Sequence, residues 1–182
     1  MVDFNRDMWE GQMTPSEREC MYNVLIEKKP ETLFEIGTWK GGGSTYFISS
    51  ALLENKKGTL YTIECEKKFY DHAINLYNTT LSYLSPYIKF FFGKSEEIYS
   101  EILKNIKDID FLLLDGKEDS NQTIIEYNMF VSHFHSGSLL ACHDWNIGKM
   151  EKLKPIIKND KNWTLIKELN EGPTGFCIYI RV

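Results

Sequence analysis

Short apolar runs alternate along the chain with longer stretches in which apolar residues recur at helical spacing. The runs with strand character span residues 33–36, 60–63, 88–92, 111–114, 138–142, 163–169 and 176–180. Strands that alternate with helices are typical of βαβ units, so the pattern predicts a mostly parallel sheet with helices on both faces.

The intervening stretches predict helices. The first begins after Thr14, which has the side chain of an N-cap, and continues through Pro15 and Glu17, two residue types favoured in a first turn. Pro30 ends it near residue 29. Further helices are expected at residues 44–53, 69–77, 96–106, 121–134 and 149–158.

The last two strand-like runs are separated by Asn170-Glu171-Gly172-Pro173-Thr174-Gly175, a turn-rich segment that predicts a hairpin. A hairpin at the end of a parallel sheet makes the last strand antiparallel. We therefore expect an α/β fold with a doubly wound, mostly parallel, seven-stranded sheet and an antiparallel last strand.

Length and composition restrict the range of functions. The chain has 182 residues, 42% of them hydrophobic, which indicates a single domain over residues 1–182 with its own core. Residues 1–30 form an N-terminal helix or lid segment in this interpretation, in which Met8, Trp9 and Met13 either close over the site or pack on the surface.

The net charge of −5 and the scattered lysines argue against a nucleic-acid partner and against binding to an anionic membrane surface. No apolar run approaches the ~20 residues that span a bilayer. The four cysteines contain no C-x-x-C pair, and we expect them to be free thiols, mostly buried, in a cytoplasmic protein.

Candidate chemistry gathers at the ends of the predicted strands. Five of them end in a glycine or a polar residue: Gly37, Glu64, Gly93, Asp115 and the pair His143-Asp144. In open α/β sheets, ligands bind at the carboxyl edge of the strands. The sequence therefore predicts a site built from several strand ends rather than from one linear motif.

The first of these strand ends opens a glycine-rich loop that includes Gly37, Gly41, Gly42 and Gly43 and leads into a helix at Ser44. Glycines let the backbone approach a ligand closely, and a helix start presents N–H groups to it. The loop matches neither G-x-G-x-x-G nor G-x-x-x-x-G-K-[ST]. A flexible turn without a ligand is the alternative interpretation.

Glu64 ends the second strand, where a carboxylate can accept two hydrogen bonds from a ribose diol. Glu66 follows closely, so an ordinary exposed glutamate is the competing interpretation.

Taken together, the motifs resemble those of class I S-adenosylmethionine-dependent methyltransferases. The resemblance rests on Glu-Ile-Gly-Thr-x-x-Gly-Gly-x-Ser-Thr at 35–45, the acidic end of strand two, Gly-Lys-Ser at 93–95 and Asp-Phe-Leu-Leu-Leu-Asp-Gly at 110–116. The small-molecule O-methyltransferase branch, with its cephalosporin-hydroxylase-like and macrolide-sugar types, is the most similar, over about residues 33–182. It implies a Rossmann-like methyltransferase fold and methyl transfer to a small-molecule hydroxyl.

The resemblance also implies which residues hold the cofactor. Glu35 and Gly37 would lie beside its methionine portion, and Gly41, Gly42, Gly43 and Ser44 would form the wall of its cleft. Glu64 would hold the ribose, Cys65 and Ser95 would lie near the adenine, and Asp115 would face the sulfonium and amino-acid end.

The catalytic group is expected in His143-Asp144-Trp145-Asn146. His143 or Asp144 could act as a general base without a metal, or Asp115, Asp144 and Asn146 could bind Mg²⁺. A third interpretation gives His143 a packing role and Asp144 a capping role. We assign His143 and Asp144 as catalytic and no residue as a metal ligand.

The sequence departs from relatives at two of these positions. Many relatives carry a histidine shortly after the strand-four Asp-Gly, where this chain has Lys117-Glu118-Asp119. Metal-dependent relatives place a second acid together with an amide or acid at the end of strand five. This chain has His143-Asp144-Trp145-Asn146 there.

Two other functions share this sheet and stay open. A nicotinamide-dependent oxidoreductase would also place an acid on a ribose, although the missing G-x-G-x-x-G counts against it. A nucleoside-binding module would have the same fold and would bind its ligand without catalysing a reaction. The few insertions suggest an open site or one completed by a second subunit, so a homodimer is also considered.

Overall fold

The structure is a computed structural model that describes residues 2–5, 13–170 and 174–182. Its strands are β1 Thr32–Ile36, β2 Thr59–Glu64, β3 Ile88–Phe92, β4 Ile109–Leu114, β5 Phe134–His143, β6 Trp163–Leu169 and β7 Phe176–Arg181. They follow the order β3-β2-β1-β4-β5-β7-β6 in a seven-stranded sheet, which confirms the predicted architecture.

The chain divides into two compact units, residues 1–94 and 95–182. The first contains the helices α1 Pro15–Lys28, α2 Ser44–Asn55 and α3 Lys67–Asn78 and the 3₁₀ segment η1 Ser82–Tyr87. The second contains α4 Ser95–Leu103, α5 Ser120–Phe130 and α6 Leu153–Asn159, with the 3₁₀ segments η2 Val131–His133 and η3 Gly148–Met150.

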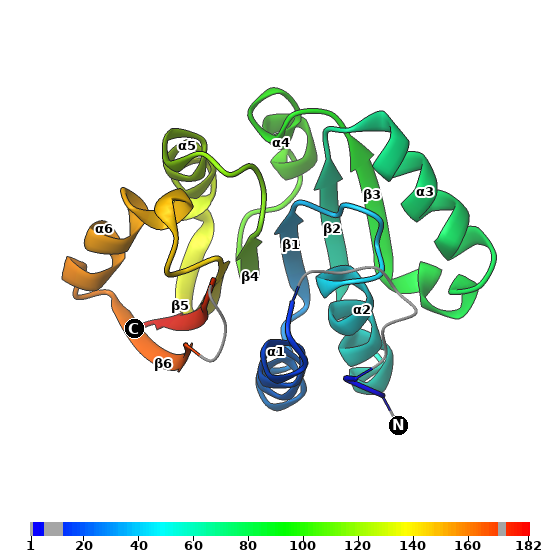
Figure 1. Cartoon of the computed structure of the whole chain (residues 1–182), viewed down its shortest axis with the longest axis horizontal. Coiled ribbons are helices and arrows are strands. Elements are labelled where there is room, and N and C mark those ends of the chain that lie inside the picture. Colours follow the sequence, from blue (N-terminus) through cyan, green and yellow to red (C-terminus); the bar gives the residue numbers. More distant parts are fainter. Residues whose placement is uncertain (1, 6–12, 171–173) are drawn as a thin grey trace. The chain divides into compact units, whose positions relative to one another are not determined.

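Helix α1 begins where the sequence predicts. The Thr14 side chain accepts a hydrogen bond from the Glu17 backbone N–H, and the Glu17 carboxylate accepts one from the Thr14 N–H, which makes a capping box. Lys29 adopts a left-handed conformation at the other end. α1 packs on α2 in the first unit (Figure 1).

In the first unit, β1, β2 and β3 are parallel neighbours (Figure 1). β1 and β2 place Glu35 directly beside Thr62, and both side chains are buried. Thr45 of α2 bonds Glu35, and the Tyr77 ring of α3 contacts Phe90 of β3. The crossover helices α2 and α3 therefore cover the face of the sheet on which Glu35 lies.

In the second unit, β4 and β5 are parallel, whereas β7 runs antiparallel to both β5 and β6. The predicted hairpin is therefore present as β6 and β7, although residues 171–173 of its turn lie outside the described part. Because Leu114 is the partner of Cys142, the residues that follow β4 and β5 leave the sheet at the same level.

Several predicted boundaries are wrong. The helix expected at 121–134 ends at Phe130, and the one expected at 96–106 ends at Leu103. β5 begins at Phe134 instead of Ser138, because the Phe134 ring packs edge-on against Trp163 and the strand passes an irregularity near Gly137 instead of turning. The helix predicted at 149–158 is two separate pieces, η3 and α6. Pro155 fits the first turn of α6, whereas it would interrupt one continuous helix.

The remaining expectations are met in part. Cys142 and Cys177 are buried, Cys20 is half-buried and Cys65 is exposed, and none of the four forms a disulfide bond. Met13 is buried, whereas Met8 and Trp9 lie outside the described residues. Within the described ranges, no helix combines the length and apolar character needed to cross a bilayer.

Candidate functional site

The glycine-rich loop between β1 and α2 is packed and not a loose turn. Gly37 and Gly41 have φ angles of 99° and 78°, a region that favours glycine. A Cβ added to Gly41 would lie 3.1 Å from the Ala73 Cβ and 3.2 Å from the Tyr77 ring. The Tyr77 hydroxyl donates to the Gly41 carbonyl, so α3 fixes the loop.

The loop ends at the start of α2 without a side-chain cap. Gly43 is the N-cap residue and has no side chain to accept from the first N–H groups. Ser44 opens the helix and is buried. The uncapped first turn of α2 is consistent with the predicted cleft wall formed by residues 41–44.

Glu64 is held in place by the backbone. One carboxylate oxygen accepts from the Trp39 N–H and the other from the Glu66 N–H, each at 2.7 Å. Trp39 reaches this position through a left-handed backbone with φ of 48°. Each oxygen keeps a second acceptor site, so the fixed carboxylate retains capacity for a diol.

Glu35, by contrast, belongs to a buried hydroxyl network. One of its oxygens accepts from the Thr45 and Thr62 hydroxyls, each at 2.7 Å, and Thr38 bonds Thr62 in turn. The network ties β1, β2 and α2 together behind the glycine loop. The contact of Glu35 with the methionine portion of the cofactor remains a prediction.

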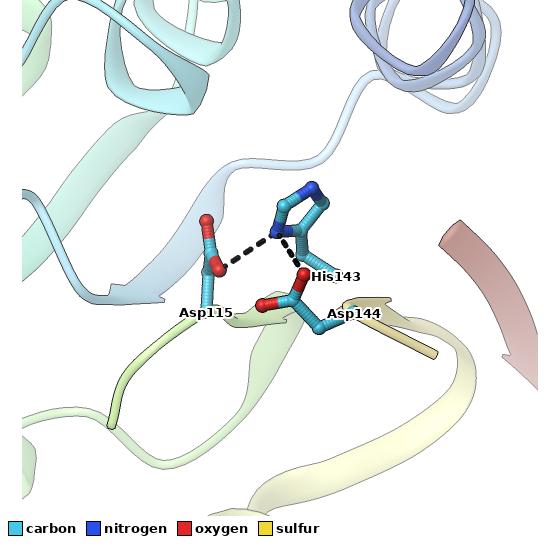
Figure 2. A group of neighbouring side chains, drawn as sticks. All are labelled: Asp115, His143 and Asp144. Atoms are coloured by element: carbon cyan, nitrogen blue, oxygen red, sulfur yellow. Dashed lines mark hydrogen bonds and ion pairs between the residues drawn. The ribbon is translucent and has the colours of Figure 1, made fainter. Parts of the chain in front are cut away.

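A second group of polar side chains lies at the ends of β4 and β5, within the second unit. Figure 2 shows Asp115, His143 and Asp144 facing one another. The His143 Nδ1 is 3.0 Å from an Asp115 oxygen and 3.4 Å from an Asp144 oxygen. Because carboxylates only accept, this geometry assigns a proton to Nδ1.

Sequence reasoning missed Lys149, which completes this group. Its Nζ lies 2.8 Å from Asp144, 3.1 Å from Asp115 and 3.8 Å from Glu118, and its side chain is 1% exposed. Burial alone would lower the pKa of Lys149, but the Asp115 and Asp144 carboxylates outweigh it and raise that pKa. Lys149 was expected on a polar helix, and its segment contains more lysines than acids, so nothing in the sequence signalled this role.

Asp144 is ionised and conformationally constrained. Burial opposes its charge, but the hydrogen bond from His143 and the charge of Lys149 hold the pKa of Asp144 well below its ordinary value. Its φ of 59° lies in the left-handed region, which aspartate tolerates better than most residues. Such strained positions concentrate at functional sites.

The turn after Asp144 is bound to the start of β7. The N–H groups of Trp145 and Asn146 donate to the Gly175 and Thr174 carbonyls, at 3.0 and 2.7 Å. The Trp145 side chain is fully buried, and the Lys154 ammonium lies 4.8 Å above its ring. These contacts hold the backbone that follows Asp144.

The Asn146 side chain is not part of the Asp115–His143–Asp144 group. Its amide donates to Asn170 and its oxygen accepts from Lys154. The arrangement does not support the magnesium ligand set of Asp115, Asp144 and Asn146 that the sequence left open.

Ser95 begins α4 and lies in the second unit. Its hydroxyl donates to the buried Glu126 carboxylate at 2.9 Å, and Gln122 bonds both residues. Burial raises the pKa of Glu126. Ser95 is therefore fixed by α5, while Cys65, next to Glu64 in the first unit, is exposed.

The sequence matches a protein-family profile described as "Methyltransferase domain" over residues 34–145, which is more than half of the chain. The matched segment runs from β1 to the turn after β5 and contains the glycine loop, Glu64, Asp115, His143 and Asp144. No curated protein sequence matches the chain significantly.

Solved structures share the fold at low identity. One is a Staphylococcus aureus protein provisionally named as a caffeoyl-CoA O-methyltransferase, with 13% identity, a TM-score of 0.77, and coverage of 94% of this chain and 86% of that chain. Another is the O-methyltransferase TomG from Streptomyces achromogenes, which is involved in tomaymycin synthesis and was solved with SAM. It has 15% identity and a TM-score of 0.76, and the match covers 94% of this chain and 82% of that chain. An O-methyltransferase from Bacillus cereus, solved with SAH, has 15% identity and a TM-score of 0.76, and the match covers 94% of this chain and 83% of that chain.

Proposed function

The chain belongs to the methyltransferase-domain family, and from this premise we propose that it transfers a methyl group from S-adenosylmethionine to a hydroxyl oxygen of a small molecule. The observation that carries the proposal is the Glu64 carboxylate. It is buried at the end of β2, both of its oxygens are fixed by backbone N–H groups, and it stands beside a packed glycine loop.

The residues of the first unit fit the cofactor. Glu64 would accept hydrogen bonds from the ribose diol, because its oxygens keep acceptor sites beyond the two backbone amides. The uncapped first turn of α2 at Gly43 and Ser44 would receive polar atoms of the amino-acid portion. When bound, S-adenosylmethionine supplies the electrophilic methyl group.

The second unit supplies the groups for the acceptor. We assign His143 and Asp144 as the pair that takes up the proton of the acceptor hydroxyl, with Asp115 orienting His143 through Nδ1. The lowered pKa of Asp144 keeps its carboxylate charged, so Asp144 would stabilise the positive charge that forms when His143 takes up the proton. Methyl transfer itself then depends mainly on alignment of the two reactants.

A small-molecule acceptor is supported by the similar structures. TomG is described as taking part in the synthesis of tomaymycin, and the Staphylococcus aureus protein is provisionally named after the acceptor caffeoyl-CoA. The finer assignment to the cephalosporin-hydroxylase-like and macrolide-sugar types stays a prediction that rests on the motif order. The homodimer also stays a prediction, which sedimentation of the purified chain would test.

Calorimetric titration with S-adenosylhomocysteine tests the cofactor site. We expect Glu64→Ala to weaken binding by more than about tenfold, since a charge-assisted hydrogen bond contributes ~1.5–3 kcal/mol. Glu66→Ala is the matched control, because Glu66 meets Glu64 only through its backbone N–H, which alanine keeps. Equal affinity of folded Glu64→Ala and the wild type would refute the assignment of this carboxylate.

Transfer itself is tested with an isotopically labelled methyl donor and a small-molecule extract. We expect labelled products in which the methyl group is on oxygen. Tight binding of S-adenosylhomocysteine without any labelled product would favour a nucleoside-binding module. Binding of NADH in place of S-adenosylhomocysteine would favour the oxidoreductase.

A further inference from the structure

The Lys149 ammonium lies against the same carboxylates that a divalent metal would use. Nζ contacts one oxygen of Asp115 and one of Asp144, and its side chain is 1% exposed. The Asp115 oxygen that it contacts is also the one that accepts from His143 Nδ1. Three positions around these two carboxylates are therefore occupied by N–H donors of the protein.

Taken alone, Asp115, His143 and Asp144 have the composition of a metal site, with one ligand atom of each within 4.8 Å of the others. Two features oppose a metal there. The ammonium would repel a divalent cation at close range, and its charge already compensates one of the two carboxylates. His143 Nδ1, which faces both carboxylates as a donor, would have to lose its proton before it could bind a metal.

The backbone holds Lys149 in this position. η3, which carries it, follows the turn that donates to the Gly175 and Thr174 carbonyls, and the adjacent Met150 is fully buried. The hydrogen-bonded turn before Lys149 and the buried Met150 after it therefore hold this segment in place, and the Lys149 side chain is buried, unlike that of the exposed Lys152 three residues later.

We infer that Lys149 is a built-in cation that takes the place of a divalent metal at the Asp115–His143–Asp144 group. It acts as a positioning residue, because it neutralises and orients the two carboxylates. The part of the inference that concerns catalysis, that methyl transfer needs no metal, rests on the proposed function. The part that concerns cation binding does not.

Binding of Mn²⁺, followed by electron paramagnetic resonance without any cofactor, tests the inference. We expect the wild-type chain to show no stoichiometric Mn²⁺ site that depends on Asp144. Lys149→Ala should gain such a site and bind Mn²⁺ at least about tenfold more tightly than the wild type. The double variant Lys149→Ala, Asp144→Asn should lose the site again.

Lys152→Ala is the matched control, since it removes the same charge from the same segment at an exposed position. It should leave Mn²⁺ binding unchanged. Lys149→Met, which keeps the aliphatic volume, serves as a second variant in case Lys149→Ala does not fold. A wild-type Mn²⁺ site abolished by Asp144→Asn would overturn the inference. So would a folded Lys149→Ala or Lys149→Met chain that gains no site.

The rate of methyl transfer provides a separate test. Where methyl transfer is detected, a chelator should leave the wild-type rate unchanged, and loss of the rate with recovery on adding Mg²⁺ would overturn the inference. If no transfer is detected, the proposed function fails, yet the Mn²⁺ titration still decides whether Lys149 occupies the cation position.

Discussion

At the scale of single residues, compensation of charge explains how the acidic side chains of the candidate site in the second unit lie close together. Two acids and a histidine are close together in the second unit because a buried lysine compensates them. The acids and the histidine were predictable, since they follow strands of obvious apolar character. Lys149 was not, because its segment reads as polar and only the packing of η3 turns the side chain inward.

Asp144→Asn should abolish methyl transfer while leaving S-adenosylhomocysteine affinity nearly unchanged. Asparagine tolerates the left-handed backbone at this position, so the fold is expected to persist. It has no negative charge with which to stabilise a protonated His143 or compensate Lys149, and we expect a rate loss of at least about a hundredfold. Single-turnover transfer and calorimetry would measure the two effects; full turnover by the variant would remove Asp144 from the mechanism.

His135 should make stability depend on pH through Asp110. The hydrogen bond from His135 to Asp110 raises the pKa of His135 above its ordinary 6.5, despite partial burial. Because the pKa of His135 is higher in the folded chain than in the unfolded chain, its interaction with Asp110 stabilises the fold fully below about pH 6.5. This contribution is lost as pH rises through the folded-state pKa of His135.

Urea unfolding at a series of pH values would show this dependence, and Asp110→Asn should flatten it. His133→Gln is the control, because the described contact of His133 is with the Lys107 carbonyl instead of a carboxylate. An Asp110→Asn chain with the wild-type pH dependence would contradict the assignment.

At the scale of elements, local chemistry fixed most boundaries correctly. The N-terminus of α1 follows from Thr14, Pro15 and Glu17, and the ends of β3 match the predicted run at 88–92. The errors occur where tertiary contacts outweigh local pattern. Phe134 joins β5 because Trp163 packs on it, a contact between residues far apart in sequence.

Thr14→Ala should lower the free energy of unfolding by ~1 kcal/mol. The substitution removes the acceptor for the Glu17 N–H and breaks the capping box. Thr14→Ser keeps the hydroxyl and should stay near the wild type. Urea denaturation monitored by circular dichroism measures the difference, and equal loss in both variants would argue against the cap.

Gly41→Ala should destabilise the chain more than Gly137→Ala. Both positions have positive φ, which costs about 1–2 kcal/mol for alanine. Only Gly41 has close neighbours, the Ala73 Cβ and the Tyr77 ring, whereas nothing lies within 4 Å of a Cβ at Gly137. An equal loss of unfolding free energy in the two variants would mean that α3 shifts to accommodate the added methyl group. The extra strain should also weaken S-adenosylhomocysteine binding in Gly41→Ala alone.

At the scale of the whole molecule, the mostly parallel seven-stranded sheet and the antiparallel β7 were predictable, because alternation of elements and a terminal hairpin leave few topologies. The two compact units were not anticipated from a chain without a linker. The glycine loop and Glu64 lie in one unit, and Asp115, His143 and Asp144 lie in the other. Sequence pattern therefore located both groups of polar residues, but it could not give the partners of each side chain.

The buried Trp145 has a practical consequence. Its indole directly follows Asp144 in the chain, donates to Glu168 at 3.2 Å and lies beneath the Lys154 ammonium. An indole in such surroundings emits at shorter wavelength than one in water, and a nearby cation shifts its emission. The protein thus carries an intrinsic fluorophore directly after the proposed His143–Asp144 pair, so a ligand that moves this turn can be followed optically without a label.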